Sequence, residues 1–348
     1  MKALGRLGAF VLLLAVATGG LAVWQTGHPY RGFQGEVFYE LKRGTTTVTM
    51  ARELAALGVV RTPWHFLSAR LLRPRAALQA GEYRFASAAS ARAVLDRIAR
   101  GDVYYVELTI PEGSNLFEIA ELVERRGLAP ASEFRRAAAD PKLIRDLAPG
   151  APSLEGYLFP STYQFSRRES AASLCRRMTA EFRKVWREVG GRGDPHDAVT
   201  LASLVETETA VAEERPLVAG VYRNRLEAGM KLDCDPTVIY AAQLVNAWRG
   251  VIYRSDLHRA HPYNTYRSAG LPPGPIANPG KASLAAALHP EPTRAVYFVA
   301  KPDGSGGHVF TETLAAHEKA VASYRRGKAN QRHATAAPVA RRKPAVRR

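Results

Sequence analysis

The chain has 348 residues, of which 46% are hydrophobic and 23% charged, and its formal net charge is +17. This length predicts two folded domains, or one with attachments, and the apolar fraction is sufficient for a packed core. The two cysteines, Cys175 and Cys234, lie far apart and show neither metal-ligand spacing nor a disulfide framework. Cys175 fits an amphipathic helix as an inert core thiol, and a single bridge in an oxidising compartment stays open.

An apolar run at residues 7–24 contains no charged residue and follows Lys2 and Arg6. The run is just long enough to span a bilayer, and Trp24 suits the far interface. We expect an uncleaved membrane anchor within residues 1–25 in preference to a cleaved signal peptide, although residues 15–17 resemble a small-residue cleavage site. The basic N-terminus predicts a cytoplasmic short end and an extracytoplasmic remainder.

Residues 36–130 are predicted to form a small α+β module with an internal repeat. The strand–turn–helix pattern of residues 103–126 is similar to the pattern of residues 44–58. The predicted strands are 37–42, 81–85 and 103–110, and the predicted helices are 50–58, 62–67, 90–101 and 115–126. Modules of this kind more often bind a ligand or act as spacers than catalyse a reaction.

Residues 131–324 are predicted to form a mainly helical domain with a small β-hairpin, so the fold class is α+β. Helical segments at 129–152 lead into an aromatic turn at 153–163. The other predicted helices are about 170–189, 201–209, 213–229, part of 231–245, 283–288 and 314–324. Strands at 296–300 and 308–311 flank a glycine-rich hairpin turn.

Two glutamates in the helix at 201–209 have different predicted surroundings. Apolar residues at 201, 204 and 205 are followed at the same helical spacing by Glu208, which places this carboxylate on the buried face. Burial disfavours the charged form and raises the pKa, which produces a general acid suited to a glycosidic oxygen. Glu206 lies off this face and can stay exposed to solvent. On this segment alone, a partly exposed Glu208 bonded to a neighbour stays open.

Asp233 and Asp235 flank Cys234 just before Thr237. Two aspartates at this spacing can ligate a metal, but Asp-Pro-Thr at 235–237 is more typical of a turn that caps the following helix. Because no other His, Cys and Asp residues have metal-ligand spacing, we predict no metal and no cofactor.

A loop at residues 261–280 combines prolines and glycines with tyrosines and asparagines. Proline fixes the backbone, and glycine permits sharp turns. Tyrosine rings can stack on apolar sugar faces while amides bind hydroxyl groups, so the loop is predicted to form a wall of a sugar-binding groove. A structural loop that crosses the edge of the core is the alternative, and both can hold at once.

His308 follows Gly306 and Gly307 in the predicted hairpin. A lone histidine there is more often structural or a hydrogen-bond donor than a catalytic base. The sequence has no Gly-x-Ser-x-Gly motif, no cysteine with an adjacent base and no phosphate-binding loop followed by Lys-Ser/Thr. Nucleophilic hydrolases and nucleotide-binding proteins are therefore disfavoured.

The C-terminal stretch 325–348 contains nine Lys and Arg residues and no acidic residue. Its composition predicts a disordered basic tail, and its removal leaves a charge of about +8, by 17 minus 9. For an exported chain, anionic lipid or acidic wall polymers are better partners than nucleic acid. A solvated tail without a partner stays open.

Several motifs in fixed order resemble one known family. They are LEGYLFPSTY at 154–163, LASLVETETAVAEERPLVAGVYRNR at 201–225, GMKL at 229–232, DPTVIY at 235–240, YNTY at 263–266, GLPPGPIANPG at 270–280 and the hairpin at 297–310. In order and spacing the chain resembles the endolytic murein transglycosylases, also called the YceG-like family. The resemblance extends from the anchor to about residue 324, and residues 36–130 are similar to the LysM-like module of that family.

The resemblance implies a bacterial inner-membrane enzyme whose catalytic domain is periplasmic. Such an enzyme is a lyase that cuts nascent, uncrosslinked peptidoglycan strands internally, between N-acetylmuramic acid and N-acetylglucosamine, and leaves 1,6-anhydromuramic ends. The catalytic glutamate of the family is the second one in the Glu-x-Glu-Thr motif, which is Glu208 here. The implied partners are glycan strands, the inner membrane and peptidoglycan synthases, and no nucleic acid is expected.

We assign substrate binding to residues within or beside these motifs, namely Glu155, Tyr157, Glu206, Asn224, Asp235, Thr237, Tyr263, Asn264, Tyr266 and His308. Glu213 and Glu214 are expected to be supporting or structural, with Arg215 paired to Glu214 and Asn224 bonded to a groove carbonyl. Two rival functions stay open. One is a non-catalytic wall-binding scaffold for synthases, and the other is a nucleic-acid binder that depends on the tail alone.

Overall fold

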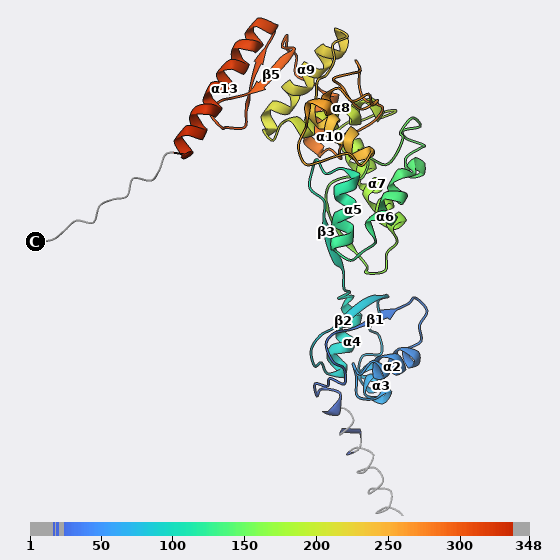
Figure 1. Cartoon of the computed structure of the whole chain (residues 1–348). Helices are drawn as coiled ribbons and strands as arrows, with labels where there is room; N and C mark the ends of the chain where they lie inside the picture. Colours follow the sequence, from blue (N-terminus) through green and yellow to red (C-terminus); the bar gives the residue numbers. More distant parts are fainter. Residues whose placement is uncertain (1–16, 18, 21–23, 337–348) are drawn as a thin grey trace, which may run out of the picture. The chain divides into compact units, whose positions relative to one another are not determined.

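The computed structural model describes residues 17, 19–20 and 24–336, with side chains described as far as residue 328 (Figure 1). The chain divides into two compact units, Met1–Val106 and Glu107–Arg348. Most of the predicted anchor at residues 7–24 lies outside the described residues. Among the helices that are described, none combines the length and the apolar character that a membrane span requires.

The first unit is a two-stranded sheet packed with three helices. Its elements are β1 (Val37–Leu41), α2 (Thr47–Ala56), α3 (Pro63–Leu72), β2 (Gly81–Phe85) and α4 (Ala91–Arg100). The strands are antiparallel, with Tyr39 opposite Tyr83. The inward faces of all five elements form one apolar core that includes Leu54, Phe66 and Ile98, each fully buried. The predicted strands and helices of this segment are confirmed, and the Ser90 side chain caps α4.

The first unit ends at Val106, whereas the sequence predicted a module that continues to residue 130. The reason is strand pairing. Strand β3 (Val106–Thr109) pairs with β4 (Thr162–Phe165), and the Ile110 amide donates to the Ser161 carbonyl at 2.9 Å. Helix α5 (Leu116–Arg125) then packs on α6 (Ala131–Ala139). The strand–turn–helix repeat is real, but its second copy belongs to the second unit.

The second unit is mainly helical. After α5 and α6 it contains α7 (Ala171–Glu188), α8 (His196–Glu208), α9 (Arg215–Glu227), α10 (Asp235–Leu244) and α12 (Lys281–Leu288). Short turns are η1 (Pro141–Leu143), η2 (Ala212–Glu214) and α11 (Arg254–Leu257). Helix α8 is central, because α9, α10 and α12 all pack on it. With these helices and the two-stranded sheets, the predicted α+β class is confirmed.

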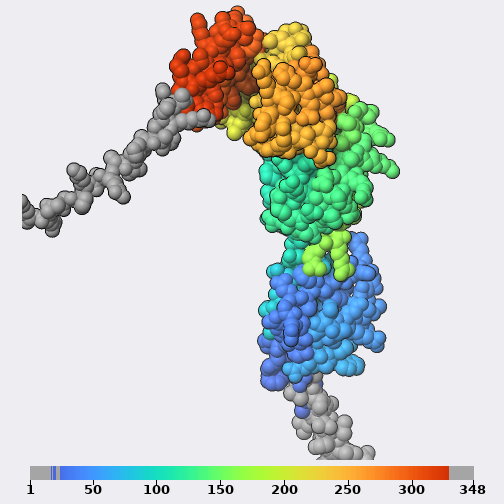
Figure 2. Space-filling model, viewed as in Figure 1, coloured from blue at the N-terminus to red at the C-terminus, as the bar shows by residue number. Residues whose placement is uncertain are grey.

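An antiparallel hairpin and a long helix complete the second unit. Strands β5 (Tyr297–Ala300) and β6 (His308–Thr311) pair as predicted, and α13 (Leu314–Ala336) packs on both strands. In the space-filling view the red residues of the hairpin and α13 adjoin the orange residues that precede them in the chain (Figure 2). The helix continues to Ala336, so the prediction of disorder from residue 325 is wrong for 325–336. Residues 337–348 lie outside the described part.

The proline-rich loop at 270–280 runs through the interior of the second unit. Residues 274–280 are all buried. The Asn278 side chain accepts a hydrogen bond from the Leu158 amide at 2.8 Å and donates to the Ser114 carbonyl at 2.9 Å. The Ile276 amide donates to the Ser203 hydroxyl of α8 at 3.1 Å. This part of the loop therefore supports α8, in agreement with the structural alternative.

Candidate active site

A groove of about 400 Å³ lies at the C-terminal end of α8. Its walls come from α9, from the turn that precedes α10, from β5 and from the start of α13. The lining residues are Glu208, Tyr222, Arg225, Leu232, Asp233, Asp235, Tyr266, Tyr297, Phe298, Leu314 and His317. Four aromatic rings and three carboxylates therefore face one space, a composition suited to a sugar polymer that has both apolar faces and hydroxyl groups.

Glu208 is the last residue of α8, and its carboxyl group faces the groove. The carboxyl accepts hydrogen bonds from the Cys234 thiol and the Tyr222 hydroxyl. Burial raises the pKa of Glu208, the negative charge of Asp235 adds to the increase, and the two hydrogen bonds and His308 oppose it. The negative end of the α8 dipole also disfavours a charge here. The predicted shift in the pKa of Glu208 is thus present in the structure.

Glu206 has a different environment from the one that the sequence predicted. Its Oε1 lies 3.2 Å from the Arg215 guanidinium, and its Oε2 accepts a hydrogen bond from the Gly280 amide at 2.9 Å. Only 6% of its side chain is exposed, so the prediction that Glu206 is exposed to solvent is wrong. Residues 199–205 of α8 are all buried, so this part of the helix, directly before Glu206, has no solvent-exposed face. Its two carboxylate oxygens thus connect α8 to Arg215 at the start of α9 and to Gly280 of the 270–280 loop, so Glu206 has a structural role.

The partner of Arg215 also differs from the prediction, because Glu214 is engaged elsewhere. Glu214 accepts from the His308 amide at 2.8 Å and lies 2.7 Å from His308 Nδ1. Burial tends to raise the pKa of Glu214, but the hydrogen bonds and charge of His308 hold it below its ordinary value. The ring of His308 lies edge-on to Phe298, with 5.4 Å between ring centroids. His308 therefore supports the groove wall and contributes positive potential near Glu208.

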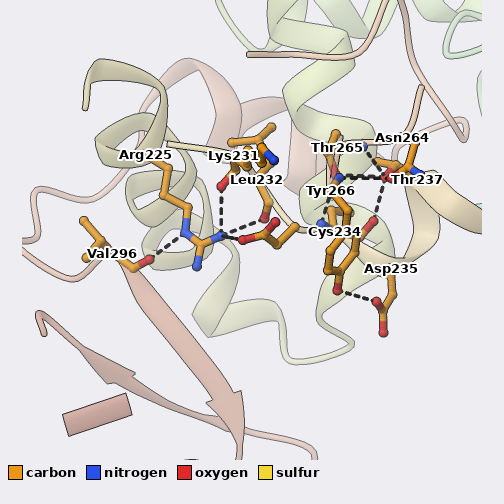
Figure 3. Close-up of polar contacts among 11 residues, drawn as sticks. Arg225, Lys231, Leu232, Cys234, Asp235, Thr237, Asn264, Thr265, Tyr266 and Val296 are labelled. Carbon is orange, nitrogen blue, oxygen red and sulfur yellow. Dashed lines mark hydrogen bonds and ion pairs between the residues drawn. The ribbon is translucent and has the colours of Figure 1, made fainter. Parts of the chain in front are cut away.

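Asp235 lies in the groove, but the predicted capping role is wrong. Helix α10 begins at Asp235, and Cys234 is the N-cap, without a side-chain hydrogen bond to the helix. The Asp235 carboxylate instead accepts from the Tyr266 hydroxyl at 2.6 Å (Figure 3). Tyr266 thus orients a carboxylate beside Glu208, and it is the one residue of the 261–280 loop among those that line the groove.

Arg225 joins three walls of the groove (Figure 3). Its Nε donates to the Val296 carbonyl at 2.6 Å, and its Nη1 donates to the carbonyls of Lys231 and Leu232 at 3.1 and 2.8 Å. Asp233 lies 3.5 Å away and adopts a positive φ of 49°. Burial raises the pKa of Asp233, and the nearby Arg225 opposes this increase. One guanidinium therefore sets the spacing of α9, the 231–233 turn and the hairpin.

Two buried threonines form hydrogen bonds to the turn before α10. Thr237 donates from Oγ1 to the Cys234 carbonyl at 2.6 Å, and its Oγ1 lies 2.9 Å from Thr265 Oγ1. The Cys234 amide donates to Thr265 Oγ1 at 3.0 Å. Thr237 is fully buried, so it positions Cys234 and does not line the groove.

The remaining predicted binding residues also lie away from the groove lining, because their polar atoms are used inside the protein. Asn264 donates to three backbone carbonyls, at 2.8 to 3.2 Å, and organises its own loop. Asn224 donates to the carbonyls of Thr293 and Ala295, at 2.8 and 2.9 Å, which hold the approach to β5.

A second buried polar cluster contains Glu155. This side chain is 1% exposed and accepts from the Leu116 amide at 2.9 Å and from Asn278 at 2.8 Å. Burial raises its pKa to about 8. The buried Tyr157 lies with its hydroxyl 3.2 Å from His196 Nδ1, and Tyr263 stacks obliquely on Tyr240. These residues belong to the scaffold.

The sequence analysis missed several residues that form the groove. The missed residues are Tyr222, Arg225, Leu232, Asp233, Cys234 as a partner of Glu208, Tyr297, Phe298, Leu314 and His317. Most of them lie inside the motifs that carry the family resemblance, which was the available signal. The apolar or aromatic character of most of them made core packing the simpler interpretation, and their convergence on Glu208 requires the tertiary structure.

Both cysteines are buried free thiols, so the open alternative of a disulfide is excluded in this structure. Within the described part of the chain, no cluster of three or more His, Cys, Asp or Glu side chains could hold a metal ion.

Comparison with known proteins identifies the family. A profile of the YceG-like family matches residues 39–323. The endolytic murein transglycosylase of Bacillus subtilis (strain 168) is 33% identical over 267 residues, which cover 71% of this chain and 73% of that relative. The endolytic murein transglycosylase of Streptococcus pneumoniae serotype 2 is 28% identical over 289 residues, which cover 73% of this chain and 52% of that relative.

A crystal structure of a YceG-like protein from Listeria monocytogenes matches with a TM-score of 0.52 and 28% identity, over 82% of this chain and 99% of that chain. The family profile spans both units and includes every residue that lines the groove. The chain belongs to the YceG-like family.

Proposed function

We propose that this protein is an endolytic peptidoglycan lytic transglycosylase, a lyase that cleaves nascent glycan strands between N-acetylmuramic acid and N-acetylglucosamine. The observation that carries the proposal is Glu208, a carboxyl group with a raised pKa at the wall of a groove of about 400 Å³. The similarity to proteins named endolytic murein transglycosylase supports the same reaction class.

In the first step Glu208 acts as a general acid. A carboxyl group whose pKa is raised holds its proton more tightly and can donate it to the glycosidic oxygen as the bond to C1 of muramic acid breaks. The proton ends on the departing 4-hydroxyl of N-acetylglucosamine, and positive charge develops at C1 and the ring oxygen. The carboxylates of Asp233 and Asp235 in the same groove stabilise this charge electrostatically.

In the second step the Glu208 carboxylate acts as a base. It removes the proton from the C6 hydroxyl of the same muramic acid, and the C6 oxygen bonds to C1 to form the 1,6-anhydro ring. The nucleophile is part of the substrate, so no water needs activation and the attack has the advantage of proximity. Glu208 regains its proton in this step, and one acid therefore completes the cycle without the paired catalytic carboxylates of ordinary glycosidases.

The groove walls supply sugar-binding surfaces. The Tyr297 ring stacks on His317 with centroids 5.0 Å apart, and the Arg225 guanidinium lies 5.3 Å from the centre of the Tyr297 ring. Phe298 meets Tyr222 edge-on at 5.9 Å. These contacts hold the rings of the hairpin in fixed orientations, as stacking on a sugar requires.

We infer that the enzyme works outside the cytoplasm, held to the inner membrane by residues 7–24. The apolar run and the basic residues before it support this placement. We also propose that the first unit is a LysM-like glycan-binding module. Its order of elements, β1–α2–α3–β2 with antiparallel strands, and the membership of the chain in a wall-enzyme family support that assignment. Peptidoglycan synthases are the expected protein partners.

The test uses the full chain and uncrosslinked glycan strands, with 1,6-anhydro ends measured by mass spectrometry. The variant Glu208→Gln keeps the shape of the side chain and removes the acid, so we expect normal folding and a loss of about 10²–10⁴ in rate. The exposed Glu213 provides the matched control, because Glu213→Gln changes a carboxylate outside the groove. Activity retained by Glu208→Gln and lost by Glu206→Gln would transfer the acid role to Glu206. No anhydro ends from the wild type would favour a binding scaffold.

A further inference from the structure

Helix α3 of the first unit is apolar on two sides. Its inner side carries Phe66 and Ala69, which are at most 1% exposed. Its outer side carries Trp64, which is 74% exposed, and Leu71, which is 79% exposed, with the adjacent Leu72 also exposed. Trp64 and Leu71 are seven residues apart, so they lie on the same face two turns apart. Large apolar side chains grouped on an exposed helix face are typical of an interaction surface.

The segment that carries this outer face is basic. Residues 61–75 contain four arginines and no acidic residue. Arg61 lies over the Tyr30 ring, 5.3 Å from its centre, and Arg73 pairs with Asp96 at 2.7 Å while 61% of its side chain stays exposed. Arg75, just beyond the helix, is exposed as well. We call Trp64, Leu71, Leu72, Arg73 and Arg75 the α3 face. Its composition, tryptophan and leucine beside arginine, matches helices that lie in the interface of an anionic membrane.

The start of α3 lies close to the point where the N-terminal apolar run meets the first unit. A hollow of about 300 Å³ in this unit is lined by residues from both places, including Trp24, His28, Arg61 and His65. Trp24 ends the apolar run at residues 7–24. If that run lies in a bilayer, the helix that carries the α3 face begins at the membrane surface.

We propose that the α3 face rests on the anionic lipid surface of the membrane in which residues 7–24 are anchored. Trp64 and Leu71 insert at the level of the lipid headgroups, and the arginines bind lipid phosphates. A protein partner is the less suitable occupant, because an exposed apolar face beside arginines and an anchor matches lipid in both chemistry and position. The inference depends on the proposed anchor and holds for any reaction that the second unit performs.

The experiment uses the full chain with a fluorescent thiol label at Leu71→Cys. The native thiols, Cys175 and Cys234, are buried, so the unsubstituted protein is expected to remain unlabelled and the new thiol reacts selectively. The labelled chain is placed in lipid nanodiscs of phosphatidylcholine alone or of phosphatidylcholine with phosphatidylglycerol. In the anionic discs we expect a blue shift of the emission and quenching by doxyl-labelled lipid. Replacement of Arg73 and Arg75 by Gln is expected to reduce both effects.

The matched control is Val251→Cys, a label on an exposed loop residue of the second unit, which should show neither effect. Identical emission at position 71 in detergent and in both kinds of disc would overturn the inference. Energy transfer between labelled chains, in place of quenching by lipid, would assign the face to a second copy and also overturn it. A chain that does not incorporate into discs overturns the anchor and this inference together. Formation of anhydro ends by the same preparation reports separately on the proposed reaction.

Discussion

Burial raises the pKa of Glu208, and the hydrogen bond from the Cys234 thiol opposes this increase. A thiol is a weak hydrogen-bond donor, whereas a hydroxyl is a strong one, and the two differ by a single atom. In Cys234→Ser the stronger donor stabilises the carboxylate form of Glu208, so the pKa of Glu208 falls. In Cys234→Ala the donor is absent, so the pKa of Glu208 rises. The two substitutions therefore have opposite expected effects on the pH dependence of cleavage.

The size of the effect follows from the hydrogen bond. A hydrogen bond to a charged group contributes about 1.5–3 kcal/mol, and we take the difference between hydroxyl and thiol donors as roughly 1 kcal/mol. Since about 1.4 kcal/mol corresponds to a factor of ten in an equilibrium constant, this difference lowers the proton affinity of Glu208 about fivefold. Glu208 must be protonated in the free enzyme, so activity is present below its pKa and is lost as the pH rises through it. On the alkaline side, Cys234→Ser should then be about fivefold slower than wild type.

The assay is the rate of anhydro-end formation from uncrosslinked glycan as a function of pH. We expect the alkaline limb to move to lower pH in Cys234→Ser and to higher pH in Cys234→Ala. Cys175→Ser is the matched control, because Cys175 is equally buried but lies in α7, outside the groove lining. Its profile should keep the wild-type pH dependence. Shifts of the same sign in Ser and Ala variants, or a limb that does not move in either, would refute the role of Cys234.

The other predictions concern stability. Glu206→Gln removes the charge that pairs with the mostly buried Arg215, so we expect the free energy of unfolding to fall by about 2–4 kcal/mol in urea denaturation. An unchanged denaturation midpoint would contradict the structural role of this ion pair. Gly156 has a φ of +85°, and a Cβ there would overlap Pro275. Gly156→Ala should therefore cost about 2–4 kcal/mol and lower the Tm by several degrees in a calorimetric scan, while a Tm equal to wild type would show that this turn relaxes freely.

Much of the local structure of this chain could be predicted from the sequence. The starts of α4 and α7 were predicted correctly near residues 90 and 170. Ser90 and Ser170 cap these helices, and a capping side chain acts on amides only two or three residues away. The hairpin of β5 and β6 was predicted from its glycine-rich turn for the same local reason. The motifs in fixed order also identified the family, and the helical spacing around Glu208 predicted the direction in which its surroundings shift its pKa.

Where the prediction failed, the deciding contact came from a distant part of the chain. Glu206 was expected to be wet because periodicity describes an isolated helix with one buried side, whereas α8 is enclosed by other helices and by the 274–280 loop. Asp235 has the composition of a cap, but Tyr266 lies within reach of its carboxylate and binds it instead. Likewise, the strand at 106–109 was recognised as a strand, but its partner at 162–165 assigns it to the second unit.

The sequence by itself thus determined the helices, the turns, the family and the identity of the proposed acid, since each of these depends on residues within a few turns of one another or on motif order. Only the tertiary structure decided which side chains surround Glu208. Tyr222 of α9 and Cys234 of the turn before α10 bond to Glu208, and Phe298 of β5 lines the same groove. Helical periodicity predicts that such residues are buried. Which side chains they contact depends on packing between segments that lie far apart along the chain.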